Sequence, residues 1–234
     1  MQSIDQYKPS NTPFDFTKYD GPYEVDRKNV IEALIPVGDA GPAVDIGCGP
    51  GYFTMQLSSR GWKTTSIDSD SENIANASHY ADESHVGDAL SVLSALPGDH
   101  YGFAVALEII EHMPPSRGEA LLKHIHRVLK PGGRLIISTP NRFSPEGLGG
   151  YYWSEKIRRA GKWQAWDPTH VHIYSSGEIL HLLKLNGFVV DRITGYYYAG
   201  RLPVIGRWQL PLKQSKRFPF NRMGFNVIVE CHKQ

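Results

Sequence analysis

The fold of this chain is decided by the stretch Val44-Asp45-Ile46-Gly47-Cys48-Gly49-Pro50-Gly51-Tyr52. A short apolar run ends at Ile46, three glycines follow at alternate positions, and residues 52–60 are compatible with a helix. This order predicts a strand, a tight turn and a helix start, a geometry that lets the backbone approach a nucleotide-like ligand. Glycine suits the turn because a Cβ atom would contact the ligand or forbid positive φ.

The spacing of the glycines narrows the class of ligand. Dinucleotide-binding loops read G-x-G-x-x-G and place a pyrophosphate at the helix N-terminus. Here the pattern is G-x-G-x-G, and Asp45 lies two residues before the first glycine. A carboxylate at that place would repel a pyrophosphate, but it suits a ligand that carries an ammonium group and a sulfonium. S-adenosylmethionine is such a ligand.

Residues 45–51 resemble the first motif of the class I S-adenosylmethionine-dependent methyltransferases, and other matches follow in the order of that family. They are a strand candidate over residues 63–67 that ends at Asp68, the turn at residues 87–89, an E-x-x-E-H ending over residues 108–112, and a turn and strand over residues 129–141. The likeness covers about residues 30–195. It implies an α/β fold of the Rossmann-like kind, with a seven-stranded, mostly parallel sheet, helices on both faces and an antiparallel last strand.

The resemblance also implies a site for S-adenosylmethionine. Asp68 would accept hydrogen bonds from the ribose hydroxyls, and Asp88 would take the adenine amino group. The residues expected around the cofactor are Asp45, Gly47, Cys48, Gly49, Gly51, Asp68, Ser69, Asp88, Ala89, Leu107 and Glu108. Structural alternatives stay open, because all three aspartates could be turn or capping residues. Cys48 is interpreted as a small residue that fits the loop, since no paired Cys or His motif accompanies it.

Three histidines are candidate catalytic residues. His112 follows the fourth strand, where the family places residues between cofactor and acceptor. It could orient or deprotonate a hydroxyl, or simply bond to Glu108 or a backbone carbonyl. His170 and His172 would share one face of an extended chain, and related methyltransferases, including the quinone-type O-methyltransferases, often carry a His ahead of the next helix. No metal is expected, because two histidines and a distant carboxylate do not specify a site, although quinone-type relatives sometimes use a divalent ion.

Composition excludes several classes of protein. The chain has 234 residues, 41% of them apolar, which suits one α/β domain with elaborations. No apolar run is long enough to span a membrane, the N-terminus lacks an apolar secretion signal, and two cysteines do not make a disulfide scaffold. These features predict a cytoplasmic protein. The net charge of +1 gives no general attraction to nucleic acid.

The predicted organisation is a single domain over residues 1–234. Residues 1–37 form an N-terminal arm and helix, and residues 38–140 form the cofactor-binding core. Two aromatic-rich insertions, at residues 141–174 and 196–225, exceed what the minimal fold needs. Because long loops inside a compact domain usually carry function, and ligands bind beyond the carboxyl ends of the strands, the insertions are predicted to form the acceptor pocket and its lid.

The sequence therefore predicts a methyltransferase that acts on a hydroxyl of a small molecule. Quinone or phenol precursors, lipid-linked phosphates and sugar-nucleotide intermediates all suit an aromatic pocket beside a basic segment. That segment has six basic and no acidic residues between Arg201 and Arg222, and it is either a solvated loop or a flap over an anionic group. RNA and protein acceptors are not expected. The alternatives are a non-catalytic binder of S-adenosylmethionine, or a peripheral membrane enzyme that uses the apolar residues 202–210.

Overall fold

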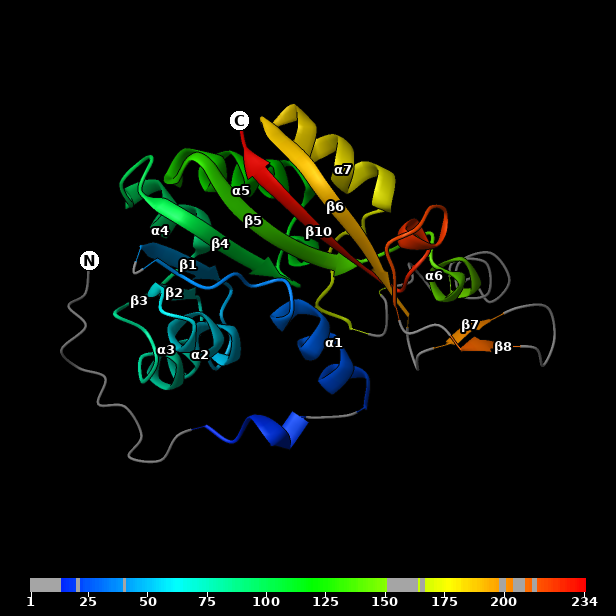
Figure 1. Ribbon diagram of the computed structural model, residues 1–234, viewed down its shortest axis with the longest axis horizontal. Helices are drawn as coiled ribbons and strands as arrows, with labels where there is room; N and C mark the ends of the chain where they lie inside the picture. Colours follow the sequence, from blue (N-terminus) through cyan, green and yellow to red (C-terminus); the bar gives the residue numbers. More distant parts are fainter. Residues whose placement is uncertain are drawn as a thin grey trace.

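The computed structural model describes residues 14–19, 22–39, 41–150, 164, 167–197, 201–203, 209–211 and 214–234. Its main sheet contains β1 (Pro42–Ile46), β2 (Lys63–Asp68), β3 (Glu83–Val86), β4 (Tyr101–Leu107), β5 (Leu129–Pro140), β6 (Phe188–Tyr196), β9 (Gln214–Ser215) and β10 (Asn226–Lys233). The strand order is β3-β2-β1-β4-β5-β10-β6-β9 (Figure 1). Two further strands, β7 (Arg201–Pro203) and β8 (Gln209–Pro211), form a separate sheet.

The pairing of the strands confirms a mostly parallel sheet with an antiparallel last strand. Strands β1 to β5 pair in parallel, whereas β10 is antiparallel to both β5 and β6. It follows that β6 runs in the same direction as β5. The predicted count of seven strands was wrong, because the second insertion returns to the sheet edge and pairs Ser215 with Gly195. This short strand β9 covers part of an otherwise open edge.

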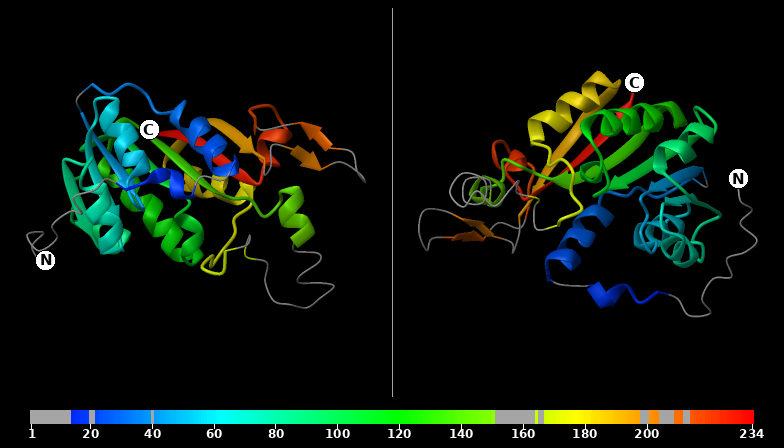
Figure 2. Two further views of the ribbon diagram at one scale, coloured as in Figure 1. Left: turned by 90° about the horizontal axis from the view of Figure 1, so that it is seen from below. Right: turned by 180° about the vertical axis from the view of Figure 1, so that it is seen from behind.

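Helices cover both faces of the sheet, as predicted (Figure 2). The helices are α1 (Pro22–Glu32), α2 (Tyr52–Ser59), α3 (Ser71–Ala77), α4 (Ala89–Ala95), α5 (Pro115–Val128), α6 (Pro145–Gly150) and α7 (Ser176–Leu185), with 3₁₀ turns η2 (Phe16–Tyr19), η3 (Ile110–His112) and η6 (Phe220–Arg222). One hydrophobic cluster joins the sheet to α4, α5 and α7, and a second joins it to α1 and α2.

The longest of these helices shows how the sequence places the core. In α5 the apolar residues fall on one stripe, and Leu121, Leu122, Ile125 and Val128 are all buried. Each such side chain contributes about 1.5–3 kcal/mol when it leaves water. At the start of α7, Ser175 and Glu178 form a reciprocal capping box.

Asn141, directly after β5, joins the two insertions. Its side-chain amide donates to the carbonyl oxygens of Arg222 and Gly224 at 2.8 and 3.0 Å, and the side chain is fully buried. The side-chain oxygen Oδ1 of Asn141 accepts from the backbone amides of Phe143 and Ser176, each at 3.2 Å. The end of β5, the start of α7 and the return of the second insertion therefore meet at one residue.

Both insertions leave the same edge of the sheet, because β5 and β6 run in the same direction. Figure 1 shows α6, β7 and β8 at the end of the molecule away from the N-terminus. Several aromatic residues on which the acceptor-pocket prediction rested, including Tyr151, Trp163 and Trp208, lie outside the described residues. The division into arm, core and insertions stays a prediction. In the described part of the chain, none of the helices has the length and apolar character needed to cross a bilayer.

Candidate cofactor and acceptor site

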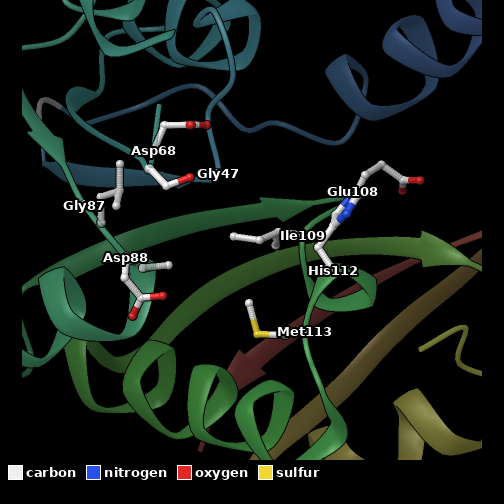
Figure 3. A pocket seen from close by; sticks show the side chains of 11 residues that line it. Gly47, Asp68, Gly87, Asp88, Glu108, Ile109, His112 and Met113 are labelled. Carbon is white, nitrogen blue, oxygen red and sulfur yellow. The ribbon is translucent and has the colours of Figure 1, made fainter. Parts of the chain in front are cut away.

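A cavity of about 320 Å³ opens beyond the carboxyl ends of β1, β2 and β4, where ligands bind in open α/β sheets. Its volume falls within the range of small-molecule sites. The residues that line it are Gly47, Ile67, Asp68, Ser69, Gly87, Asp88, Ala89, Glu108, Ile109, His112 and Met113. Figure 3 shows Asp68 and Asp88 on one side of this cavity, and Glu108, Ile109 and His112 on the other.

The glycine loop joins β1 to α2, and two of its glycines have different roles. Gly51 has φ of +95°, and a Cβ atom there would lie 2.6 Å from the Cα of Ala77 in α3. Gly49 has φ of +53°, but a Cβ atom there would meet nothing within 4 Å. Gly51 is therefore required by packing within the protein, whereas Gly49 leaves open space that a ligand can approach.

Asp45 lies behind the loop and does not line the cavity. Its carboxylate accepts a hydrogen bond of 2.7 Å from the hydroxyl of Thr54 in α2. Burial raises the pKa of Asp45 to about 7, although the Thr54 bond opposes the shift. Burial also raises the pKa of the Cys48 thiol well above its ordinary value, and the nearby charge of Asp45 raises it further. Such a thiol is unreactive, in agreement with the interpretation of Cys48 as a small residue that fits.

Asp68, at the end of β2, connects the glycine loop to the next turn. One of its oxygens accepts from the amide of Gly49 at 2.8 Å, and the other accepts from the amide of Asp70 at 2.9 Å. The N-cap of α3 is Asp70, which accepts from the Glu72 amide. The side-chain amide of Asn73 also donates to Asp68, at 3.3 Å. A carboxylate has about four acceptor positions, so Asp68 keeps capacity for one ligand hydroxyl at the cavity.

Asp88 caps α4 and also faces the cavity. It accepts from the amide of Ser91 at 3.2 Å, so the capping role that the sequence left open as an alternative is confirmed, and the adenine contact stays a prediction. The guanidinium of Arg117, from the first turn of α5, forms an ion pair with the same carboxylate. Sequence reasoning missed Arg117, because the two residues are far apart along the chain and no motif links them.

Glu108 follows β4 in the left-handed region, with φ of +53°. Its carboxylate accepts from the Ser138 hydroxyl and from the Asn226 amide, each at 2.5 Å. The residue therefore lines the cavity while it joins β4 to the ends of β5 and β10. A non-glycine residue in this conformation needs support from its surroundings, and these two bonds supply it.

The backbone brings the histidine-bearing segment to the end of β4. The amides of Val171 and His172 donate to the carbonyl oxygen of Glu111 at 2.8 and 3.0 Å. As a result, the rings of His112 and His170 lie with their centroids 4.8 Å apart. His172 instead packs on Tyr174, with a centroid distance of 4.5 Å. The structure thus unites two of the three predicted histidines.

The two rings differ in their surroundings. His112 is exposed, and its Nδ1 lies 3.1 Å from the hydroxyl of Thr169. His170 is buried, and its Nδ1 lies 2.8 Å from the carbonyl oxygen of Gln164. Because a carbonyl oxygen can only accept, Nδ1 of His170 carries the proton and Nε2 offers a lone pair when the ring is neutral.

Glu111 is fully buried beside these rings. Neither oxygen of its carboxylate has a hydrogen-bond partner among the described residues. Burial raises the pKa of Glu111 well above its ordinary value, and the charge of Glu108 adds to this shift. One ligand atom from each of Glu111, His112 and His170 lies within 4.8 Å of the others. The prediction of no metal weighed His170 and His172 with a distant carboxylate, whereas the structure places Glu111 next to His112 and His170. That no metal is used stays a prediction.

The predicted cofactor residues fall into two sets. Gly47, Asp68, Ser69, Asp88, Ala89 and Glu108 line the cavity, as does the candidate catalytic residue His112. Asp45, Cys48, Gly49, Gly51 and Leu107 do not line it, and Leu107 is buried in the cluster with α1 and α2. The lining residues that the predictions omitted are Ile67, Gly87, Ile109 and Met113. The only sequence feature that could have identified them is their position, because each lies within a motif or next to a motif residue.

Comparison with known proteins agrees with this geometry. A family described as a methyltransferase domain matches residues 26–193. The ubiquinone biosynthesis O-methyltransferase of Rickettsia akari (strain Hartford) is 29% identical over 174 residues, which cover 71% of this chain and 65% of that protein. The enzyme of the same name from Rickettsia bellii (strain OSU 85-389) is 32% identical over 162 residues, which cover 66% and 64%. This chain therefore spans just under two thirds of the length of these relatives.

Solved structures share the fold at lower identity. An S-adenosylmethionine-dependent methyltransferase from Archaeoglobus fulgidus superposes with a TM-score of 0.66 at 19% identity, covering 93% of this chain and 97% of that one. Magnesium protoporphyrin IX methyltransferase from Synechocystis PCC 6803, solved with bound S-adenosylhomocysteine, gives 0.58 at 18% identity, covering 96% and 90%. The methyltransferase-domain family matches most of the length of this chain. This chain therefore belongs to the class I S-adenosylmethionine-dependent methyltransferases.

Proposed function

We propose that this chain transfers a methyl group from S-adenosylmethionine to a hydroxyl oxygen of a small-molecule acceptor. One observation carries the proposal. Two acidic side chains suited to binding a nucleoside, Asp68 and Asp88, lie on one side of the cavity, and the exposed imidazole of His112 lies on the other. A methyl donor held by the acids would leave the opposite side of the cavity for the acceptor. The division into two walls suits a transfer between two bound molecules.

The cofactor wall would hold the donor through a few groups. The remaining acceptor position of Asp68 suits a ribose hydroxyl, and Asp88 suits the adenine amino group. The open space above Gly49 allows close approach of the ligand to the backbone. Asp45 lies behind the loop, where a carboxylate favours a cationic ligand. When bound, S-adenosylmethionine supplies a methyl group on a positively charged sulfur.

The acceptor wall would position and deprotonate the hydroxyl. Methyl transfer needs the acceptor oxygen, methyl carbon and sulfur nearly in line, and this positioning supplies much of the acceleration. As the oxygen–carbon bond forms, the carbon–sulfur bond breaks and its electron pair stays on sulfur. The hydroxyl proton passes to the imidazole of His112, which Thr169 and the ring of His170 orient.

The acceptor class follows from the relatives and from the insertions. Two relatives at about 30% identity are named ubiquinone biosynthesis O-methyltransferase, which supports a phenolic or quinone-type acceptor. The aromatic composition of residues 141–174 and 196–225 suits such a ring. Lipid-linked phosphates and sugar-nucleotides are the competing acceptors, because the second insertion is also basic.

The test is transfer of a labelled methyl group from S-adenosylmethionine to a panel of phenols, lipid-linked phosphates and sugar-nucleotides. We expect label on the oxygen of a phenol, located by mass spectrometry. Label on nitrogen or carbon would refute transfer to oxygen. Tight binding of S-adenosylhomocysteine without product from the panel or from a cell extract would instead favour a non-catalytic binder.

The group of Glu111, His112 and His170 also suits a divalent cation, because it combines two imidazoles with a carboxylate that has no other partner among the described residues. The same assay separates the two uses of the group. After dialysis against a chelator, unchanged turnover supports His112 as the base. Turnover that is lost and then restored by added magnesium or zinc would assign the group to a metal.

A further inference from the structure

The end of the molecule beyond β6 and β10 exposes aromatic side chains to water. Phe218 is 75% exposed and Phe220 is 38% exposed, on the turn that leads into η6. Phe143, on the neighbouring turn that begins at Asn141, is 51% exposed. No other aromatic side chain stands among the exposed large hydrophobic residues of the described ranges. Large apolar groups that gather on one surface usually mark a contact with another molecule.

The backbone that carries Phe218 and Phe220 is held firmly. The Tyr197 hydroxyl donates to the carbonyl oxygen of Phe220 at 2.6 Å, and Asn141 donates to that of Arg222 at 2.8 Å. A Cβ atom on Gly195 would lie 2.5 Å from the carbonyl oxygen of Phe220, so η6 packs directly against β6. The rings therefore stand in solvent although their turn is tightly packed, and loose folding does not account for their exposure.

Basic side chains flank these rings, and one of them, Lys216, also lines a cavity with Asp26 of α1. Lys216, Arg217 and Arg222 are exposed, and no ion pair joins them to other described residues. The guanidinium of Arg222 lies 5.8 Å from the centre of the Phe218 ring. No acidic residue occurs between Arg201 and Arg222. Aromatic rings flanked by cations suit the boundary between lipid headgroups and acyl chains.

We infer that Lys216, Arg217, Phe218, Phe220 and Arg222, here called the Phe218 surface, dock the protein onto an anionic phospholipid bilayer. The basic side chains would attract the headgroups, and the two rings would enter the interface. A nucleic acid is less well matched, because the whole chain carries a net charge of only +1 and the basic residues are local to this turn.

The sequence alternative of a peripheral membrane enzyme placed the membrane contact on a different segment. The expectation rested on the apolar residues 202–210, of which residues 204–208 lie outside the described ranges. The Phe218 surface is defined without them. It lies at the same end of the molecule as β7 and β8 (Figure 1).

The experiment is co-sedimentation of the full chain with phosphatidylcholine vesicles that contain or lack phosphatidylglycerol. We expect binding only to the anionic vesicles, and weaker binding as salt is added. Replacing Phe218 and Phe220 together by Ser should weaken binding about tenfold, since the apolar contact is lost. Replacing Lys216 and Arg217 together by Gln should weaken it about fivefold for each charge removed.

Matched controls use exposed residues elsewhere. The variant Val37→Ser with Leu185→Ser removes two exposed apolar side chains, and Lys130→Gln with Lys184→Gln removes two charges. Both controls should bind vesicles like the unchanged protein. Absence of binding to anionic vesicles, or equal losses in the controls, would overturn the inference. So would single-stranded RNA that binds more tightly than the vesicles and is lost in the Phe218 and Phe220 variant.

Discussion

The two walls of the cavity are built in different ways. On the cofactor wall and behind it each acid has a partner: Asp68 bonds to the Gly49 amide and Asp88 to the Ser91 amide, while Asp45, behind the loop, bonds to Thr54. On the acceptor wall the ring of His112 is exposed, and behind it the fully buried carboxylate of Glu111 has no hydrogen-bond partner among the described residues. The chain itself therefore holds the acids of the cofactor wall in place, whereas the acceptor side holds polar atoms without a partner in the described part of the chain, which a ligand would satisfy.

This difference predicts that mutations on the cofactor wall act on folding and donor affinity, and those on the acceptor wall act on turnover. Gly51→Ala should show the largest effect. Its Cβ atom would meet the backbone of Ala77 and its φ of +95° disfavours any side chain, so we expect a loss of about 3–4 kcal/mol in the free energy of unfolding. Denaturant titration measures this loss.

Gly49→Ala is the matched control for that change. A Cβ atom at Gly49 has open space around it, so only the left-handed backbone costs stability, by about 1 kcal/mol. Affinity for S-adenosylhomocysteine, measured by calorimetry, should fall because the methyl group occupies space open to the ligand. Equal losses of stability in the two variants would contradict the assignment of Gly51 to packing within the protein and of Gly49 to the approach of the ligand.

His112→Gln should lower kcat by about a hundredfold, because a base at the acceptor hydroxyl is lost. Affinity for S-adenosylhomocysteine should not change. His172→Gln serves as the comparison, because His172 neither lines the cavity nor belongs to the group with Glu111, and we expect it to lower kcat much less. A parallel fall in donor affinity in His112→Gln would move this residue to the cofactor wall.

Asp45 should make folding stability depend on pH. Its pKa is raised from 3.8 to about 7 in the folded chain, so between these values the folded state holds a proton that the unfolded state has lost. Stability from this group is therefore full at low pH and falls as the pH rises, by up to about 1.4 kcal/mol per pH unit in this interval. Asp45→Asn should remove this slope, and denaturant titration at a series of pH values measures it. A variant whose free energy of unfolding keeps the same pH profile would contradict the assignment.

Asp68→Ala should have the smallest of these effects. We expect donor affinity to fall by about 1–2 kcal/mol, since charged hydrogen bonds to the ligand are lost. Asp70→Ala is the control, because Asp70 caps α3 and does not line the cavity. It should reduce stability by about 1 kcal/mol and leave affinity unchanged. An unchanged dissociation constant in Asp68→Ala would remove this residue from the site.

The sequence was sufficient wherever the site is local along the chain. The strand, glycine turn and helix at residues 42–59 follow from neighbouring residues, and so does the capping box of α7. The remaining contacts join distant segments. Glu108 bonds to Asn226, Arg117 pairs with Asp88, and His170 reaches His112 only because two amides bind the carbonyl oxygen of Glu111. Such contacts depend on topology, which periodicity and local propensity do not encode.

Asn141 has a consequence for how this protein can be altered. The two insertions meet at its single side chain, while the cofactor wall lies on β1, β2 and α4 and makes no use of it. A chimera that takes both insertions from another methyltransferase can therefore keep its donor-binding half, provided that it retains this amide and its four bonds. Where the insertions form the acceptor pocket, as predicted from the sequence, such a graft would carry the acceptor preference with it through a junction at one asparagine.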